Sequence, residues 1–412
     1  MTRRVVITGM GIVSAVGLTV EESWNNIKEG RTGIGPITHF DVSNFSVKLA
    51  GEIKNFQPEL YMPTKEVRRR DPYQRFVVAA SKEALAGGFT VKESERGRTS
   101  VMIGSGVGGV GSYYGECEVV YRTGDPRRIT PMAIPMLMVN GGSDYVGIDI
   151  GAGGPSFVPA SACATGADCI GVAYHYIRSG RLDQALAGAG DSTIFNIGLA
   201  AFDRTGACSR ETDPARACRP FTKNRPGMVF GEGAGVIALE ELEQAKARGA
   251  NILAEVVGYG STADSYHITA PEPEGIGASE ALKEALADAK LNIDDIDYIN
   301  AHGTGTGLND AMETRAVKRV FGERAYEIPM SSTKSMTGHA MGGTAAFEAI
   351  FCVMALRDQV APPTIAFDEV DPELDLDYVP NVAREVPIRH VMSNSFGFGG
   401  HNVSLILSKF EG

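Results

Sequence analysis

The sequence predicts an α/β protein built around parallel or mixed β-sheets. Three observations indicate this class. Strand-like and helix-like patterns alternate along the 412 residues, apolar residues make up 43% of the chain, and no stretch rich in proline and serine divides it like a linker. Size alone suggests two or three domains. Glycine, at 50 residues, exceeds its usual share of about 7%, as tight loops and closely approaching backbones require.

The N-terminal segment predicts the first strand. Residues 5–14 are rich in β-branched side chains. The preceding pair Arg3 and Arg4 could mark a secretory leader, but Gly9 and Gly11 interrupt the apolar run. A buried strand followed by a turn is therefore the better interpretation.

The remaining elements follow from caps, breakers and periodicity. Helices are expected over residues 19–30, 71–85, 242–248, 279–290 and 310–321. Strands are expected over residues 101–103, 250–258, 391–395 and 403–407. This alternation extends to the C-terminus.

Cys163 is the most informative residue. It follows an apolar, strand-like run over residues 155–162 and precedes small residues at 164–168, after which a helix is expected to about residue 177. A helix N-terminus favours negative charge, so a thiol placed there is expected to ionise more easily. The small neighbours leave room for an acyl group at the sulfur, as a thiolate nucleophile needs. The alternative is a buried structural cysteine.

Two further segments end short strands with reactive side chains. Residues 300–306 (NAHGTGT) contain His302, and residues 331–339 (SSTKSMTGH) contain Lys334 and His339. A single histidine is more often a satisfied polar residue. A cysteine, two histidines and a lysine at strand-to-loop exits form a constellation typical of an active site.

With these residues the sequence resembles the β-ketoacyl-[acyl carrier protein] synthases of the thiolase superfamily. Within that family it is most similar to the elongating Cys-His-His condensing enzymes of the synthase II type. The matching segments run in order through almost the whole chain: 5–11 (VVITGMG), 162–166 (ACATG), 231–235 (GEGAG), 302–306 (HGTGT), 334–339 (KSMTGH) and 394–400 (NSFGFGG).

A weak internal repeat in the sequence supports the fold that the resemblance implies. Residues 161–178 and 339–357 share one pattern, in which a reactive residue and small residues lead into an apolar helix that ends in arginine. The resemblance implies a duplicated thiolase-like fold with five layers, αβαβα, and these two helices in the middle layer. We expect an N-terminal half, residues 1–250, with the nucleophile, and a C-terminal half, residues 251–412, with the two histidines and the lysine.

The resemblance implies a decarboxylative Claisen condensation in fatty-acid elongation. Cys163 would hold the acyl group, and malonyl-[acyl carrier protein] would lose CO2 and attack it, giving β-ketoacyl-[acyl carrier protein]. His302 and His339 would hold the malonyl thioester carbonyl, and Lys334 would orient them. The backbone N–H groups of Cys163 and Phe398 would form an oxyanion hole, and the Phe398 side chain would control access of malonyl.

The resemblance also assigns supporting residues. Thr304 and Thr306 match positions that contact the pantetheine arm, and Glu348 matches a glutamate that pairs with the motif lysine. Asp310 and Glu313 could suggest paired carboxylates, but a place at a helix start, where negative charge is favourable, is the better interpretation.

Two glycine-rich runs have simpler explanations than a cofactor. Residues 104–109 (GSGVGG) match G-x-G-x-x-G, but no clear βαβ unit ending in an acidic residue follows. We interpret them as a turn near the floor of the active site, and residues 231–235 as a packing motif.

Composition limits the partners. The net charge of −11 argues against nucleic acid, and no apolar run approaches the roughly 18 residues of a membrane helix. The six cysteines show no zinc-like spacing and no disulfide framework, so we expect no metal and a cytoplasmic location. No cofactor is expected beyond the phosphopantetheine of the acyl carrier protein, which carries the substrates.

Carrier protein and dimerisation are the expected partner contacts. An acidic enzyme needs local positive charge to dock an acidic carrier, and the candidates are Lys65, Arg68, Arg69, Arg127 and Arg128. The resemblance places their segments beside the pantetheine tunnel. It also implies a homodimer formed by edge strands of the N-terminal halves, with the apolar residues 131–139 near that contact and near the acyl tunnel.

Alternatives remain at this point. Gly307, Pro226 and residues 203–206 depart from the family pattern, so a ketosynthase of a specialised polyketide or polyene pathway is possible, as is a heterodimer with a related subunit. A non-catalytic chain-length-factor-like subunit would lack the nucleophile, whereas Cys163 is present. A thiolase would lack the second active-site histidine, and an initiating synthase would have asparagine in place of His339.

Overall fold

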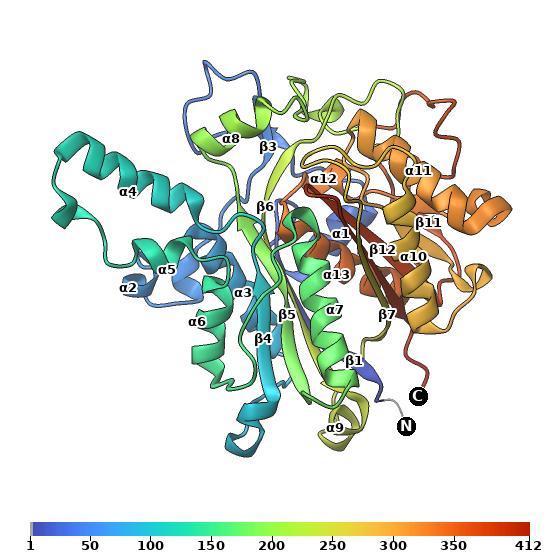
Figure 1. The fold of residues 1–412 in the computed structure, drawn as a ribbon, viewed down its shortest axis with the longest axis horizontal. Helices are drawn as coiled ribbons and strands as arrows, with labels where there is room; N and C mark the ends of the chain where they lie inside the picture. The colour runs from blue at the N-terminus through green and yellow to red at the C-terminus, as the bar shows by residue number, and fades with distance from the viewer. Residues whose placement is uncertain (1–2) are drawn as a thin grey trace.

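The computed structural model describes residues 3–412 and arranges them in five layers (Figure 1). Helices form the two outer layers and the middle layer, and a β-sheet lies on each side of the middle helices. On one outer face lie α3 (Pro72–Leu85) and α6 (Gly141–Ile150), in the middle α7 (Thr165–Arg178) and α13 (Gly342–Asp358), and on the other outer face α10 (Ile276–Ala289) and α11 (Gly307–Phe321).

The sheet of the first half has the order β4-β5-β6-β1. Strand β4 is parallel to β5, whereas β6 is antiparallel to both β5 and β1. The strands are β1 (Val5–Val13), β4 (Thr99–Gly104), β5 (Gln184–Ser192) and β6 (Phe230–Glu241). Residues 5–13 thus form a buried strand inside a sheet, as their composition predicts.

The sheet of the second half repeats this pattern. Its order is β8-β12-β13-β7, with β8 parallel to β12 and β13 antiparallel to both of its neighbours. The strands are β7 (Ala254–Ala263), β8 (Tyr298–Asn300), β12 (His390–Gly397) and β13 (His401–Ser408), and β9 (Met330–Ser331) adds to β8. The same order and directions in both halves confirm the predicted duplicated α/β fold. A short β1–β7 pairing joins the two sheets.

The middle helices are buried on most sides because the glycines of β6 let them approach. Residues 342–356 of α13 are all buried. A Cβ at Gly235 would lie 2.9 Å from the backbone of Ala346, and one at Gly233 would lie 2.8 Å from the Phe347 ring. The 231–235 run is therefore a packing motif in this structure.

Short elements complete the chain. The helices are α1 (Val20–Lys28), α2 (Thr64–Val67), α4 (Val110–Thr123), α5 (Ala133–Leu137), α8 (Asn196–Asp203), α9 (Leu242–Ala247) and α12 (Lys334–Thr337). The strands are β2 (Gly35–Pro36), β3 (Leu49–Gly51), β10 (Val360–Ala361) and β11 (Arg384–Glu385). The predicted caps at Thr19 and Asp71 are present. In the part of the chain that is described, no helix is long and apolar enough to cross a membrane.

The run before Cys163 differs from the prediction. Residues 155–162 do not form a strand, although they lie along β4: Gly154 N–H donates to the Thr99 carbonyl at 2.8 Å, and Ser100 Oγ donates to the Pro155 carbonyl at 2.5 Å. Pro155 and Pro159 lack the N–H groups that a ladder would use. This segment occupies the position beside β4 that β9 occupies beside β8 in the other half.

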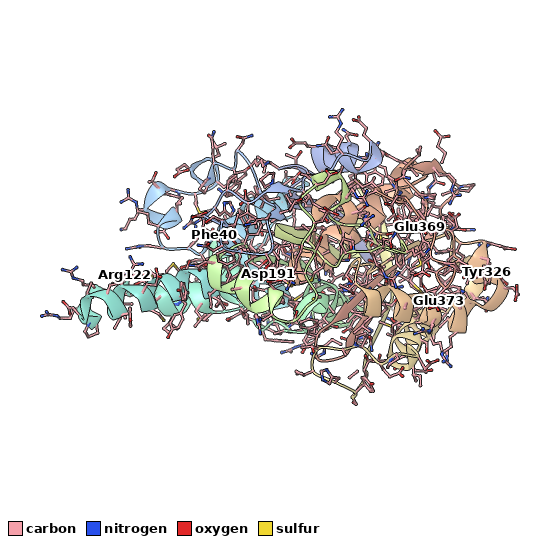
Figure 2. All side chains as sticks on the ribbon, turned by 90° about the horizontal axis from the view of Figure 1, so that it is seen from above. Phe40, Arg122, Asp191, Tyr326, Glu369 and Glu373 are labelled. Atoms are coloured by element: carbon pink, nitrogen blue, oxygen red, sulfur yellow. The ribbon has the colours of Figure 1, made fainter. Side chains whose placement is uncertain are left out.

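An arm projects from the first half. It comprises α4, a 3-10 turn at Pro126–Arg128 and α5, and it extends away from the layers (Figures 1 and 2). No residue of α4 is fully buried, and Tyr121 is 91% exposed.

Candidate active site

Cys163, His302 and His339 line one cavity of about 320 Å³. The sheets bring them together, because Cys163 precedes middle helix α7, His302 follows β8, and His339 lies between α12 and middle helix α13. The lining also contains Thr304, Thr306 and Phe398, together with residues 205–207 and 269–271. The constellation inferred from three separate segments thus forms one site.

The nucleophile loop is a tight turn with a strained residue. Ala162 has φ +51°, a left-handed conformation that costs a non-glycine residue about 1–2 kcal/mol. Thr165 holds the turn: its Oγ1 accepts from Ser161 N–H at 3.0 Å and donates to the Ala162 carbonyl at 2.8 Å. Cys163 follows the strained residue in a single 3-10 turn before α7 begins.

The expected easy ionisation of Cys163 is wrong for this structure. Burial raises the pKa of the Cys163 thiol to about 11, although Lys334 and the Phe398 N–H group act to lower it, and Asp191 adds to the rise. The side chain packs in an apolar cluster with Phe230 and Met341, among others. Desolvation of the anion therefore outweighs the helix N-terminus. The resting group is a thiol, so its proton must leave as the sulfur attacks.

We expect alkylation of Cys163 by iodoacetamide to accelerate with pH without a plateau below about pH 10. The thiolate is the reactive form, and its fraction rises about tenfold per pH unit below the pKa of about 11. Mass spectrometry of the Cys163 peptide measures this rate separately from that of exposed Cys117. A plateau that begins between pH 7 and 8 would show that the thiol ionises easily after all.

His302 and His339 form a neutral pair. Their ring centroids lie 5.4 Å apart at an interplanar angle of 84°, and both side chains are buried. Burial, followed by the charge of Lys334, lowers the pKa of each histidine well below its ordinary value. Neutral imidazoles each keep one N–H donor, as stabilisation of a developing oxyanion requires.

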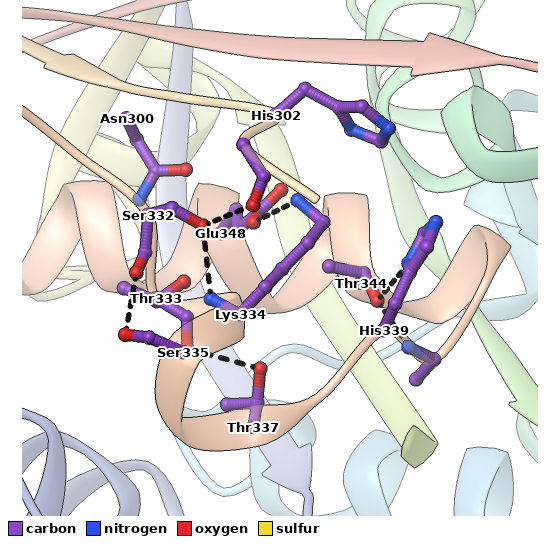
Figure 3. A network of polar contacts seen from close by, with 12 residues as sticks. Asn300, His302, Ser332, Thr333, Lys334, Ser335, Thr337, His339, Thr344 and Glu348 are labelled. Carbon is purple, nitrogen blue, oxygen red and sulfur yellow. Dashed lines mark hydrogen bonds and ion pairs between the residues drawn. The ribbon is translucent and has the colours of Figure 1, made fainter. Parts of the chain in front are cut away.

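The hydrogen bonds of Thr344 assign the tautomer of His339. Thr344 Oγ1 accepts from Ala340 N–H at 2.6 Å and lies 3.2 Å from His339 Nδ1 (Figure 3). The hydroxyl proton is then free to go to Nδ1, which leaves the His339 proton on Nε2. The buried Nδ1 of His302 has no hydrogen-bond partner among the described residues.

Lys334 lies beneath the histidines and pairs with Glu348, as the resemblance implies. Lys334 Nζ lies 2.5 Å from Glu348 Oε1, and both side chains are almost fully buried (Figure 3). Burial raises the pKa of Glu348 to about 7, and Lys334 opposes that rise. Ser332 Oγ donates to the Gly303 carbonyl at 2.6 Å and so connects this loop to the His302 loop.

Asp310 and Glu313 do more than occupy a helix start. Both are fully buried. Glu313 accepts the N–H groups of His302 and Gly303, each at 2.8 Å, and burial raises the pKa of its carboxyl to about 7. Asp310 accepts Gly305 N–H at 3.2 Å. The two carboxylates therefore fix the backbone that carries His302. The signal for this role in the sequence is a pair of acids three residues apart on a helix beside a histidine loop.

The remaining predicted site residues, Thr304, Thr306 and Phe398, line the same cavity as the thiol. Thr304 and Thr306 lie 2.9 Å apart through their hydroxyl oxygens and line the cavity. Phe398 lies in the turn between β12 and β13, and its N–H group is directed at the Cys163 sulfur. Its ring lies 6.3 Å from that of Phe202, centroid to centroid.

The predicted docking residues do not line this cavity. Lys65 lies in α2 and Arg68 and Arg69 follow it, whereas Arg127 and Arg128 lie in the arm. All five are exposed, but Arg69 pairs with Glu66 at 3.3 Å and Arg127 with Asp125 at 2.9 Å. The apolar residues 131–139 also lie in the arm and not at the cavity. Their expected place beside the dimer contact and the acyl tunnel stays a prediction.

The turn at residues 104–109 lies behind the nucleophile. A Cβ at Gly106 would lie 3.0 Å from the Ala162 carbonyl oxygen. The buried carboxylate of Asp191 accepts N–H groups of Gly106 and Val107, at 3.0 and 3.2 Å, and that of Gly343 at the start of α13, at 3.2 Å. The run thus packs against the nucleophile loop from behind.

Comparisons with known proteins agree along the whole chain. The family model "Beta-ketoacyl synthase, N-terminal domain" matches residues 2–245, and "Beta-ketoacyl synthase, C-terminal domain" matches residues 253–368. The 3-oxoacyl-[acyl-carrier-protein] synthase 2 of Staphylococcus aureus (strain COL) is 45% identical over 410 residues, 99% of either chain.

Solved structures are similar as well. The ishigamide ketosynthase/chain length factor superposes with a TM-score of 0.92 at 35% identity over 100% of both chains. A type II polyketide ketosynthase, solved as AntDE:AntF with its acyl-carrier protein and bound to the hexaketide, gives a TM-score of 0.90 at 30% identity, again over 100% of both chains.

Proposed function

The chain belongs to the β-ketoacyl synthase family, and we propose that Cys163, His302 and His339 perform its decarboxylative condensation. The chain is an acyltransferase-type condensing enzyme of fatty-acid elongation with a thiolase-like fold. The observation that carries the residue assignment is the convergence of one thiol and two neutral imidazoles in a single cavity.

The first half-reaction loads the acyl group. The Cys163 sulfur attacks the thioester carbonyl of the acyl carrier and loses its proton as it does so. The carrier thiol leaves with a proton, and an acyl-Cys163 thioester remains. The N–H groups of Cys163 and Phe398 stabilise the oxyanion of the tetrahedral intermediate. A neutral imidazole is the nearby group that can take up the thiol proton.

The second half-reaction uses the histidines. His302 and His339 donate hydrogen bonds to the thioester carbonyl oxygen of malonyl-[acyl carrier protein], CO2 leaves, and the electron pair moves into an enolate. The enolate carbon attacks acyl-Cys163 and expels the Cys163 thiolate. The product is β-ketoacyl-[acyl carrier protein]. Burial keeps both imidazoles neutral, and the charge of Lys334, which is held by Glu348, adds to this effect. Thr304 and Thr306 contact the pantetheine arm at the mouth.

The experiment that tests this function combines products with a trapped intermediate. Purified protein with malonyl and acyl carrier proteins should release CO2 and form a β-ketoacyl product, and mass spectrometry should find the acyl group on the Cys163 peptide. Acylation of Cys169 or Cys208 instead would overturn the assignment of the nucleophile.

Further parts of the proposal rest on the same chemistry. Residues 1–250 and 251–412 act as the two halves of the duplication, with the nucleophile in the first and the histidines in the second. The reaction uses phosphopantetheine-bound substrates and calls for no metal or other cofactor. A reducing cytoplasm suits the six cysteines, all of which are free thiols.

A second candidate is a ketosynthase of a specialised polyketide or polyene pathway. The observation that favours it is the close superposition with the ishigamide ketosynthase/chain length factor and with AntDE:AntF. Incubation with saturated and polyunsaturated acyl carriers separates the two candidates, because only a polyene-type enzyme should prefer the conjugated substrate. A non-catalytic subunit is disfavoured because Cys163 is present.

We expect the purified chain to be a homodimer. Residues 155–161 lie along β4 at the edge of the first sheet. The first half also carries exposed apolar side chains: Tyr121, Ile134, Ile148 and Phe157 are 91%, 58%, 78% and 42% exposed. Light scattering should give twice the mass of one chain at micromolar concentration. Phe157→Asp should shift the protein toward monomers, and a monomeric wild type would contradict the prediction.

We also expect the basic residues outside the cavity to dock the carrier protein. Arg68→Glu with Arg69→Glu should raise KM for carrier-bound substrate strongly and flatten its salt dependence, because a positive patch steers an acidic partner. Activity toward a small pantetheine-like thioester should hardly change, since the cavity is untouched. Equal loss on both substrates would show that these arginines support the fold instead.

A further inference from the structure

The strained turn at Cys163 has a support that the condensation mechanism does not use. Asp168 lies one turn into α7 and is 7% exposed. Ser161 Oγ, two residues before the nucleophile, donates to its Oδ2. The residues that flank Cys163 on both sides are therefore connected to each other by a buried side-chain hydrogen bond.

The same carboxylate reaches the other half of the molecule. Tyr259 OH donates to Asp168 Oδ1 at 2.6 Å, and Ser261 Oγ donates to the same oxygen at 3.2 Å. Both residues belong to β7, the first strand of the second half. Asp168 thus accepts three hydroxyl donors, one from the nucleophile loop and two from β7.

The backbone is shaped to allow this contact. Tyr259 packs against α7 at Gly171, where a Cβ would lie 2.2 Å from the tyrosine ring. A larger residue at 171 would displace the ring and its hydroxyl. The close approach of α7 and β7 therefore brings the Tyr259 hydroxyl to Asp168.

We propose that Asp168 is a positioning residue that, through Ser161, sets the direction of the Cys163 thiol and anchors it to β7. Ala162 holds a left-handed conformation that needs support from its surroundings. Asp168 and Thr165 supply that support from two sides of Ser161, at its Oγ and at its N–H group. The inference rests on the proposed role of Cys163 as nucleophile.

This role differs from that of an ordinary acid near a helix N-terminus. A carboxylate that acted only on the helix dipole would need no fixed partners, and its loss would lower stability without selecting one half-reaction. A positioning residue affects acyl transfer, which depends on the thiol, and leaves decarboxylation to the histidines. The two half-reactions therefore separate the roles.

The test compares Asp168→Asn and Asp168→Ala with wild type in both half-reactions. Acylation of Cys163 should fall about tenfold in Asp168→Asn, whose amide nitrogen cannot accept a hydroxyl donor, and about 10²-fold in Asp168→Ala, the scale of a small misplacement of a reacting group. Decarboxylation of malonyl-[acyl carrier protein] should stay within about twofold. The rate of iodoacetamide alkylation of Cys163 at fixed pH should fall along with acylation.

A tyrosine pair supplies the matched control. Tyr259→Phe and Tyr174→Phe each remove a hydroxyl that bridges α7 and β7, since Tyr174 OH donates to the Val257 carbonyl at 3.0 Å. Only Tyr259 reaches Asp168. Tyr259→Phe should slow acylation several-fold without slowing decarboxylation, whereas Tyr174→Phe should slow neither. This pair keeps the test valid if Asp168→Ala does not fold.

Three outcomes would decide against the inference or its premise. Parallel loss of both half-reactions together with a lower Tm would assign Asp168 to stability alone and overturn the proposal. Unchanged acylation in the Asp168 variants and in Tyr259→Phe would overturn it as well. Failure of wild type to acylate at Cys163 would instead overturn the proposed function, and the wild-type peptide map shows this before any variant is made.

Discussion

Cys163→Ala should abolish condensation and leave decarboxylation of malonyl-[acyl carrier protein] measurable. In the proposed mechanism the sulfur bears the acyl group, and alanine offers no nucleophile in its place. The imidazoles of His302 and His339 keep their positions, because the contacts of their loops with Glu313 and Thr344 do not involve Cys163. The measurement pairs a β-ketoacyl product assay with release of labelled CO2.

Cys169→Ala is the matched control for this variant. Cys169 lies in α7, the helix that follows Cys163, and is fully buried, but it does not line the cavity. Its removal should leave condensation near the wild-type rate. If Cys163→Ala still formed β-ketoacyl product, the role of the thiol as acyl carrier would have to be given up.

His339→Ala should lower decarboxylation by about 10²-fold or more, the usual effect of removing an oxyanion donor. The enolate oxygen would lose one of its two proposed donors. Loading of Cys163 should fall much less, since we propose that the N–H groups of Cys163 and Phe398 stabilise the oxyanion of that step. Separate assays of CO2 release and of acyl-Cys163 formation measure the two effects.

A milder variant tests the assignment of the His339 tautomer. Thr344→Val removes the hydroxyl near Nδ1 and keeps the side-chain shape, so the His339 proton is no longer held on Nε2. Decarboxylation should then fall by about tenfold, between wild type and His339→Ala. A normal rate in His339→Ala would refute the role of this histidine, and a normal rate in Thr344→Val would refute only the tautomer.

Much of the site could be predicted because its signals are local. Glycines, small residues and caps act within a few positions, so residues 162–166, 302–306 and 334–339 could each be identified, although no strand directly precedes 162–166. Alternating patterns predicted the strands and helices, and the weak internal repeat of residues 161–178 and 339–357 indicated the duplication, which strand order then confirmed.

The ionisation of Cys163 and the supports of the His302 loop could be described only from the tertiary structure. The pKa of Cys163 depends on burial among apolar groups from several elements, and this burial reverses the effect expected from the helix N-terminus alone. The loop-fixing role of Asp310 and Glu313 also appears only once the helix is packed against the His302 loop. Both the desolvation of the thiol and the short distances from these carboxylates to the loop arise only when the chain is packed.

By itself, the sequence predicted the class of fold from its alternating patterns. Through the family resemblance it also predicted the duplication and the residues that we propose to react. The tertiary structure alone shows which side chains of the two halves contact each other behind the nucleophile. Asp168 and Tyr259 stand 91 residues apart in sequence, yet one hydrogen bond connects them behind the nucleophile. No local pattern marks such a pair, because the contact exists only where α7 and β7 pack closely enough to exclude a side chain at Gly171.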